Sequence, residues 1–103
     1  MKITDDNYEE ILSRPGTLAV IDFWATWCGP CQRLSPIIES VAAEYEGRAI
    51  VGKYNVENNE ELTERFGVRN IPTVLFIKDG EVLERVSGAV NAAKLRELID
   101  KHV

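Results

Sequence analysis

Apolar residues along the chain follow first a strand pattern and then a helix pattern. Residues Leu18–Trp24 are apolar almost without interruption, which is typical of a strand buried on both faces, and only Asp22 departs from this pattern. Apolar residues then recur at helical spacing from Cys31 to Tyr45, which predicts an amphipathic helix. Pro36 is expected to remove one backbone hydrogen bond and to bend this helix, and Gly47 is expected to end it.

Three more strands are predicted downstream of this helix. Ala49–Val56 is rich in apolar residues and predicts a second strand. Thr73–Ile77 and Val82–Val86 flank the Asp-Gly turn of Lys78–Glu81, which predicts an antiparallel hairpin.

Polar capping residues predict three further helices. A short N-terminal helix that buries Tyr8, Ile11 and Leu12 is expected to end near Pro15. A third helix carries Leu62 and Phe66 and should end at Gly67, and the last carries Leu95, Leu98 and Ile99. The residues expected to cap these helices are Thr4 or Asp5, Asn58 or Asn59, and Asn91.

The order of these elements predicts an α/β fold. Strand–helix–strand crossovers give parallel neighbours and the hairpin gives an antiparallel pair, so the sheet should be mixed. We expect a central sheet of four to five strands between layers of helices, four helices in all, within a single domain of residues 1–103.

The charge balance excludes some classes of partner. Twelve Lys and Arg against seventeen Asp and Glu give a net charge of −5, which argues against binding to nucleic acid or to an anionic membrane. The N-terminal residues turn acidic and contain no signal-like apolar run, so the prediction is a cytoplasmic protein. No long apolar face remains uncovered in the pattern, which favours a monomer.

The residues Trp27-Cys28-Gly29-Pro30-Cys31 carry the candidate chemistry, because they join a buried strand to a helix. Cysteines three positions apart on a first helical turn can bond to each other, and the unpaired N–H groups of a helix N-terminus stabilise a thiolate. Cys28 is therefore expected to be an exposed nucleophile of low pKa. Pro30 suits a first turn, and Gly29 leaves room for a second polypeptide.

Three other interpretations of the two cysteines remain open. They could be half of a zinc site, for which His102 is the only further strong nitrogen or sulfur ligand. They could form a purely structural disulfide, although so short a loop constrains the unfolded chain little. They could also be buried and inert. In a cytosolic chain, catalysis or metal binding is more usual for such a pair.

The segment Ile21–Cys31 resembles the active-site segment of the thioredoxin family. The resemblance extends over essentially the whole chain, slightly shortened at the N-terminus. Its further matches, in order, are Pro36, Lys53, Phe66–Val68, Ile71–Thr73, Lys78–Gly80 and Gly88. A lone Cys-x-x-Cys is a weak motif, whereas this ordered set is specific.

The resemblance implies a role for each matched residue. Asp22 would accept the proton of Cys31 through water, or alternatively cap a backbone group, and Lys53 would either tune Asp22 or simply be solvated. Pro72 would follow a cis peptide bond. The expected substrate groove comprises Trp27, Gly29, Pro30, Ile71, Pro72, Gly88 and Ala89. Trp24, Gly67 and Gly80 are expected to be structural.

The Gly-Pro pair between the cysteines resembles reducing members of the family rather than isomerases or glutaredoxins. The resemblance implies reduction of diverse protein disulfides through a mixed disulfide, no bound cofactor or metal, and recycling by a thioredoxin reductase. Gln32 departs from the lysine common at its position and could alter Cys28 slightly. An oxidase or isomerase, and a scaffold module that needs no turnover, remain as alternatives.

Overall fold

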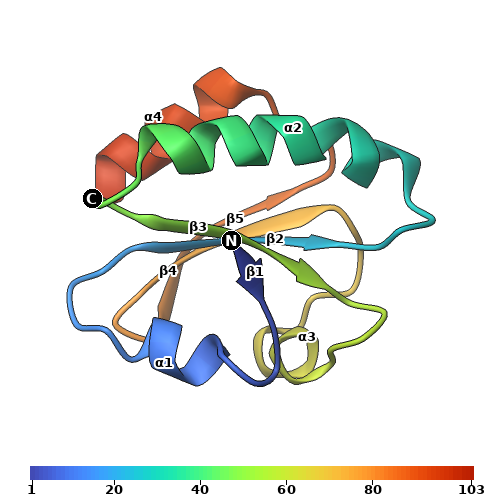
Figure 1. The fold of residues 1–103 in the computed structure, drawn as a ribbon, viewed down its shortest axis with the longest axis horizontal. Coiled ribbons are helices and arrows are strands. Elements are labelled where there is room, and N and C mark those ends of the chain that lie inside the picture. The colour runs from blue at the N-terminus through green and yellow to red at the C-terminus, as the bar shows by residue number, and fades with distance from the viewer.

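The computed structural model describes residues 1–103 and has three layers (Figure 1). A five-stranded sheet separates two pairs of helices. One face carries α2 (Gly29–Glu44) and α4 (Ala92–His102), and the other carries α1 (Tyr8–Leu12) and α3 (Glu61–Phe66). The predicted α/β fold with a mixed sheet and four helices is confirmed. No helix is long and apolar enough to cross a membrane.

The sheet has the spatial order β1-β3-β2-β4-β5. Its strands are β1 (Lys2–Ile3), β2 (Ala19–Trp24), β3 (Ile50–Asn55), β4 (Thr73–Lys78) and β5 (Glu81–Ser87). The first three strands in this order are mutually parallel, and β4 and β5 run antiparallel to their neighbours. The central strand β2 is covered on both faces, which explains its nearly continuous apolar sequence.

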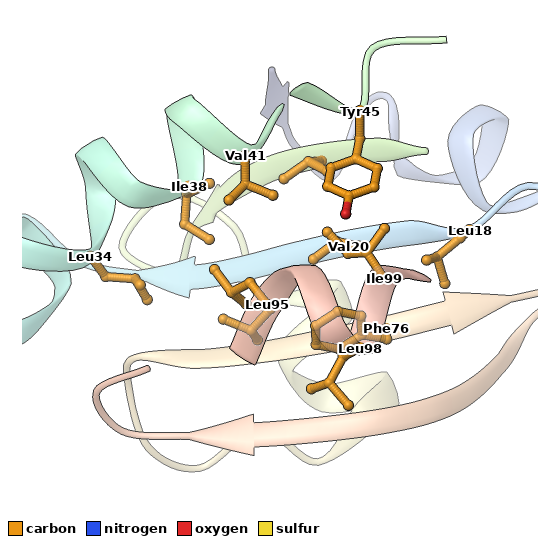
Figure 2. Packing of buried hydrophobic residues seen from close by; sticks show 12 residues of the cluster. Leu18, Val20, Leu34, Ile38, Val41, Tyr45, Phe76, Leu95, Leu98 and Ile99 are labelled. Atoms are coloured by element: carbon orange, nitrogen blue, oxygen red, sulfur yellow. The ribbon is translucent and has the colours of Figure 1, made fainter. Parts of the chain in front are cut away.

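Two separate cores lie on the two faces of the sheet. One packs α2 and α4 against residues such as Val20 and Phe76, as Figure 2 shows. The other lies under α1 and α3 and includes Ile21 and Phe23. Because side chains alternate along a strand, Asp22 shares the face of Val20, beneath the layer of α2 and α4. This alternation places a carboxyl group in an otherwise apolar core.

The hairpin between β4 and β5 has the predicted tight turn. Asp79 and Gly80 have φ angles of 53° and 78°. This left-handed conformation is the one that a two-residue hairpin turn requires and that an Asp-Gly pair supplies. The prediction from the sequence is therefore confirmed at this turn.

Several predicted helix ends are wrong. The residue at the N-cap of α1 is Asn7 rather than Thr4 or Asp5, and that of α3 is Glu60 rather than Asn58 or Asn59. Asp5 instead accepts the N–H groups of Glu60 and Glu61, 3.0 and 3.3 Å away, from a distant part of the chain. A cap supplied by tertiary contact has no local sequence signal.

Other ends agree with the sequence. The side chain of Asn91 accepts the N–H of Lys94 at 2.8 Å and caps α4 as predicted. Gly67 ends α3 with a φ of 63°.

The helix α2 runs through Pro36 and ends at Glu44, one turn before the predicted Gly47. Strand β1 lies before the first predicted helix, where its two residues are too few to give a strand pattern.

Candidate active site

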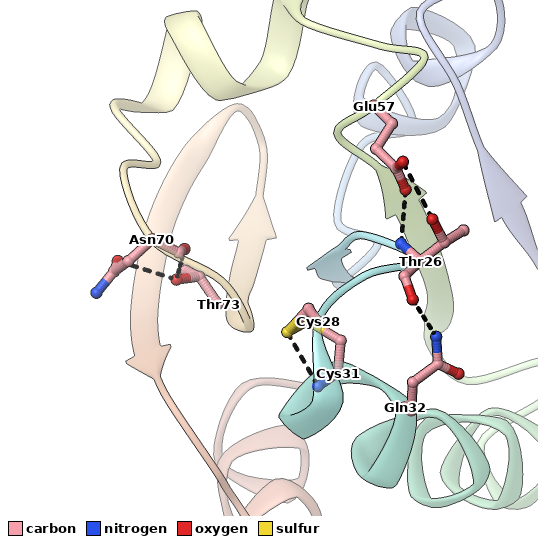
Figure 3. Close-up of a disulfide and its surroundings, with 7 residues drawn as sticks. All are labelled: Thr26, Cys28, Cys31, Gln32, Glu57, Asn70 and Thr73. Atoms are coloured by element: carbon pink, nitrogen blue, oxygen red, sulfur yellow. Dashed lines mark hydrogen bonds between the residues drawn. A yellow bond between two sulfur atoms is a disulfide. The ribbon is translucent and has the colours of Figure 1, made fainter.

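Cys28 and Cys31 are joined by a disulfide at the start of α2, with 5.2 Å between their Cα atoms. Cys28 is the N-cap residue, in extended conformation with a φ of −90°, and Pro30 lies in the first turn. The Sγ atom of Cys28 accepts the backbone N–H of Cys31 at 3.2 Å (Figure 3). Such a contact stabilises negative charge on this sulfur, as does the helix N-terminus itself.

The prediction that Cys28 is exposed is wrong for this disulfide form. Cys28 is only 5% exposed and Cys31 1%. Together with Ala25 the two cysteines form a small cluster against which Trp24, Val56 and Ile71 pack, and this packing covers the sulfurs. The neighbouring Trp27 is 72% exposed and marks the surface beside the disulfide.

Asp22 is completely buried on the central strand β2. Neither of its carboxyl oxygens has a hydrogen-bond partner, so the alternative that it caps a backbone group is wrong. Burial penalises the charged form and raises the pKa of Asp22 to about 7, although the charge of Lys53 lowers it in part. A carboxyl group with this pKa can take up and release a proton near neutrality.

Lys53 is half-buried on β3, opposite Asp22 in the register of the two parallel strands. Its ammonium group donates to the hydroxyl of Ser35 on α2 and lies 4.4 Å from the centre of the Trp24 ring. It is therefore held in place rather than freely solvated. Trp24 itself is only half-buried, so its expected place in the core is confirmed in part.

The peptide bond between Ile71 and Pro72 is cis, as the resemblance implies. Pro72 is buried and its carbonyl accepts the N–H of Gly88 at 2.8 Å. The hydroxyl of Thr73 donates to the carbonyl of Asn70 at 2.7 Å across the same bend (Figure 3). Ile71 packs against the cysteine cluster, so this bend lies directly against the disulfide.

Comparison with known proteins identifies the family. The thioredoxin family model matches residues 1–101. The chain is 41% identical over 100 residues to Thioredoxin 2 of Chlorobaculum tepidum, covering 97% of this chain and 92% of that protein. It is 39% identical over 103 residues to the thioredoxins of Buchnera aphidicola and Staphylococcus haemolyticus, covering all of this chain and 95% and 97% of theirs.

The chain belongs to the thioredoxin family. It is a thiol–disulfide oxidoreductase of the thioredoxin type, and Cys28–Cys31 is its redox-active disulfide. Thioredoxins bind no cofactor and are reduced by thioredoxin reductase. Membership therefore implies a reductase and disulfide-containing substrates as partners.

A hollow beside the disulfide contains two of the seven residues expected to form the substrate groove. This hollow of about 510 Å³ brings Trp27 and Ile71 together. The other residues that line it are Val56, Thr63, Val68, Arg69 and Asn70, none of which was predicted. Of the other five expected residues, Gly29, Pro30 and Ala89 are exposed, Gly88 is half-exposed and Pro72 is buried, and none of them lines this hollow.

Two observations bear on the alternative roles of the cysteines in this thioredoxin-family chain. His102, the only histidine, lies at the end of α4, where its Nε2 atom is 2.7 Å from the carboxylate of Glu84. It therefore does not join the cysteine pair as a zinc ligand. The thioredoxin family match over residues 1–101 favours a redox-active disulfide over a purely structural one.

Proposed function

We propose that this thioredoxin-type protein is a reductant of protein disulfides in which Cys28 is the nucleophile and Cys31 the resolving thiol. The observation that carries the assignment is the contact between Cys28 Sγ and the N–H of Cys31 at the N-cap of α2. Only the first cysteine has this position, and a thiolate is stabilised there. The side chain of Trp27, next to Cys28, is largely exposed and marks the face that a substrate approaches.

The proposed reaction transfers two electrons in two exchange steps. The Cys28 thiolate attacks one sulfur of a substrate disulfide, whose bond breaks as a mixed disulfide forms, and the released substrate thiolate takes up a proton. Cys31 then loses its proton and attacks Cys28 Sγ. The mixed disulfide breaks, the second substrate sulfur leaves and is protonated, and the Cys28–Cys31 disulfide is formed.

Asp22 is the proposed acceptor of the proton that Cys31 loses. Its carboxyl group is buried, has no protein partner, and has its pKa raised to about 7, so it is free to bind a proton. No direct hydrogen bond joins it to a cysteine sulfur. Transfer through a bridging water is therefore the route we propose. Lys53 is the proposed tuning residue, since its charge lowers the pKa of Asp22.

The proposed substrate is an extended segment of a protein that carries a disulfide. The backbone beside Pro72 would pair with it, and Trp27, Gly29, Pro30, Ile71, Gly88 and Ala89 would form the mostly apolar surround. A thioredoxin reductase is the proposed electron donor. The monomeric state and the cytoplasmic location stay predictions.

A redox equilibrium tests this function. The protein would be equilibrated against defined thiol buffers and the Cys28–Cys31 pair followed by thiol alkylation. A potential of about −270 mV supports a reductant, whereas one of about −180 to −120 mV would make the protein an isomerase or oxidase. If the pair formed no reversible disulfide, the redox assignment would fail and a scaffold role would replace it.

A further inference from the structure

Thr26, two residues before Cys28, is held through three of its polar groups. Its N–H and its hydroxyl both donate to the carboxylate of Glu57, the hydroxyl at 3.1 Å. Its carbonyl accepts the side-chain amide of Gln32 at 2.8 Å. Figure 3 shows these bonds on the side of the disulfide away from Asn70 and Thr73. We call Glu57, Thr26 and Gln32 together the Thr26 clamp.

The clamp acts on the turn that leads into the active site. The N–H of Cys28 donates to the carbonyl of Ala25 at 3.3 Å, so Thr26 and Trp27 are the central residues of a tight turn. The peptide groups before and after Thr26 are the two that the clamp holds. Fixing both peptide groups fixes the path of the chain from β2 into Cys28.

The two outer members of the clamp come from other elements than the turn. Gln32 is on the first part of α2, where its own N–H donates to the carbonyl of Cys28 at 3.2 Å. Glu57 follows β3, and its N–H donates to the side chain of Asn55 at 2.9 Å. The turn is thus tied both to the helix and to the neighbouring parallel strand.

We propose that Glu57 and Gln32 are positioning residues that keep Cys28 at the N-cap of α2 when the disulfide is open. The proposal rests on the nucleophilic role of Cys28 given above. In the oxidised protein the disulfide to Cys31 already restrains this position. In the reduced protein that restraint is gone, and only non-covalent contacts hold the Cys28 sulfur against the N–H of Cys31.

Loss of the clamp should therefore raise the pKa of the Cys28 thiol. The N-cap position stabilises the thiolate only while the sulfur stays there. A mobile turn would let Cys28 leave it for part of the time, and the thiolate would lose this stabilisation. Sequence alone showed only that Gln32 replaces a common lysine, whereas the structure gives its amide a partner.

The charge of Glu57 affects the pKa of the Cys28 thiol in the direction opposite to the hydrogen bonds of the clamp. The N–H and then the hydroxyl of Thr26 lower the pKa of this carboxyl, so it stays ionised under ordinary conditions. A negative charge near Cys28 disfavours a thiolate. Removing Glu57 would thus combine two opposed effects, whereas changing Gln32 to an uncharged residue alters the clamp alone.

Gln32→Met is the primary test. Methionine has a similar length, carries no charge and is a comparable helix former, but it lacks the amide donor. The reduced variant and wild type would be alkylated with iodoacetamide over a range of pH, and Cys28 would be quantified by peptide mapping. We expect alkylation roughly three- to tenfold slower in the variant below the thiol pKa, and equal rates well above it.

Glu57→Gln and Glu57→Leu form a matched pair. Both remove the charge, but only the glutamine retains groups that can bond to the N–H and the hydroxyl of Thr26. We expect Cys28 to be alkylated more slowly in Glu57→Leu than in Glu57→Gln. A merely structural role would lower the melting temperature without moving the pH profile.

Two results would overturn the proposal, and they are distinguishable. If wild-type Cys28 has a depressed pKa and Gln32→Met keeps the same profile, the clamp does not position the nucleophile. If wild-type Cys28 itself titrates like an ordinary thiol, with a pKa of about 8.5, the nucleophile assignment fails and the clamp proposal fails with it. A shifted profile in Gln32→Met, with the expected difference between the Glu57 variants, supports the proposal.

Discussion

Asp22 and Lys53 lie opposite each other on neighbouring parallel strands but do not form an ion pair. The ammonium group of Lys53 is bonded to Ser35 instead and lies over the ring of Trp24. The carboxyl group of Asp22 is consequently buried with only a partial electrostatic compensation, which is why its pKa is raised to about 7 despite the nearby cation. Burying the charged form of Asp22 lowers the free energy of unfolding by an amount that depends on pH.

Replacing Asp22 by Asn should stabilise the protein at alkaline pH. Because the folded-state pKa is about 7 against an ordinary 3.8, the native state binds more protons than the unfolded state between these values. Stability therefore falls as the pH rises through this window and is lowest above it. At about pH 8 we expect Asp22→Asn to raise the free energy of unfolding by roughly 2–4 kcal/mol, with little change at about pH 4.

Urea unfolding of wild type and Asp22→Asn across this range measures the effect. A wild-type stability that does not fall between about pH 4 and pH 8, relative to the variant, would contradict a raised pKa of Asp22. Under the proposed mechanism the same variant keeps its fold but releases reduced substrate more slowly. An unchanged rate of this Cys31 step would make Asp22 structural only.

Replacing Lys53 by Met should raise the pKa of Asp22 further. The lysine charge is the cause that lowers this pKa, and methionine removes the charge while retaining much of the chain length. Carbon-13 NMR of the Asp22 carboxyl group would measure the titration directly. Lys2→Met is the matched control, because Lys2 pairs with Lys53 in the register but is exposed on the edge strand β1. An equal pKa in wild type and Lys53→Met would exclude tuning by Lys53.

The sequence was most informative where structure is local. The run of Leu18–Trp24 predicted the central strand, and the single polar residue in it predicted the buried Asp22. The Asp-Gly turn and the cap at Asn91 were predicted equally well, since each depends on a few adjacent residues. The site at Cys28 was predicted for the same reason, because helix start and cysteine spacing lie in one short segment.

Features that depend on contacts between distant segments could not be predicted. Asp5 bonds to the start of α3, 55 residues away, and this contact explains why the caps predicted for α1 and α3 are wrong. The burial of Cys28 depends on Val56 and Ile71, brought to it by other strands and loops. The bond between Thr26 and Glu57 spans 31 residues, and neither residue type is unusual in a loop. The local residue pattern does not indicate such contacts between distant segments.

Replacing Tyr54 by Phe should destabilise the fold through one of these distant contacts. The hydroxyl of Tyr54 donates to Asp5 at 2.6 Å and accepts the N–H of Leu62 at 3.1 Å, and both Tyr54 and Leu62 are fully buried. Phenylalanine keeps the ring packing but leaves the N–H of Leu62 without a partner. We expect a loss of about 1–3 kcal/mol in the free energy of unfolding, measured by urea denaturation.

Tyr8→Phe is the control for that prediction. The hydroxyl of Tyr8 bonds only to the carboxylate of the exposed Glu61, at 3.0 Å, so water can replace the lost partner. Its substitution should cost less than that of Tyr54. Equal costs for the two variants would show that the Leu62 N–H is not the source of the loss.

Replacing Cys31 by Ser should trap the mixed disulfide between Cys28 and a substrate. Cys28 is expected to keep its place at the N-cap, since the backbone N–H of residue 31, which its Sγ atom accepts, is still present in the serine variant. Attack on the substrate therefore continues, but no thiol remains to resolve the intermediate. Mass spectrometry after incubation with a disulfide-containing protein would detect the adduct, and Cys28→Ser should give none. Normal turnover by Cys31→Ser, or equal trapping by both variants, would refute the assignment of nucleophile and resolving thiol.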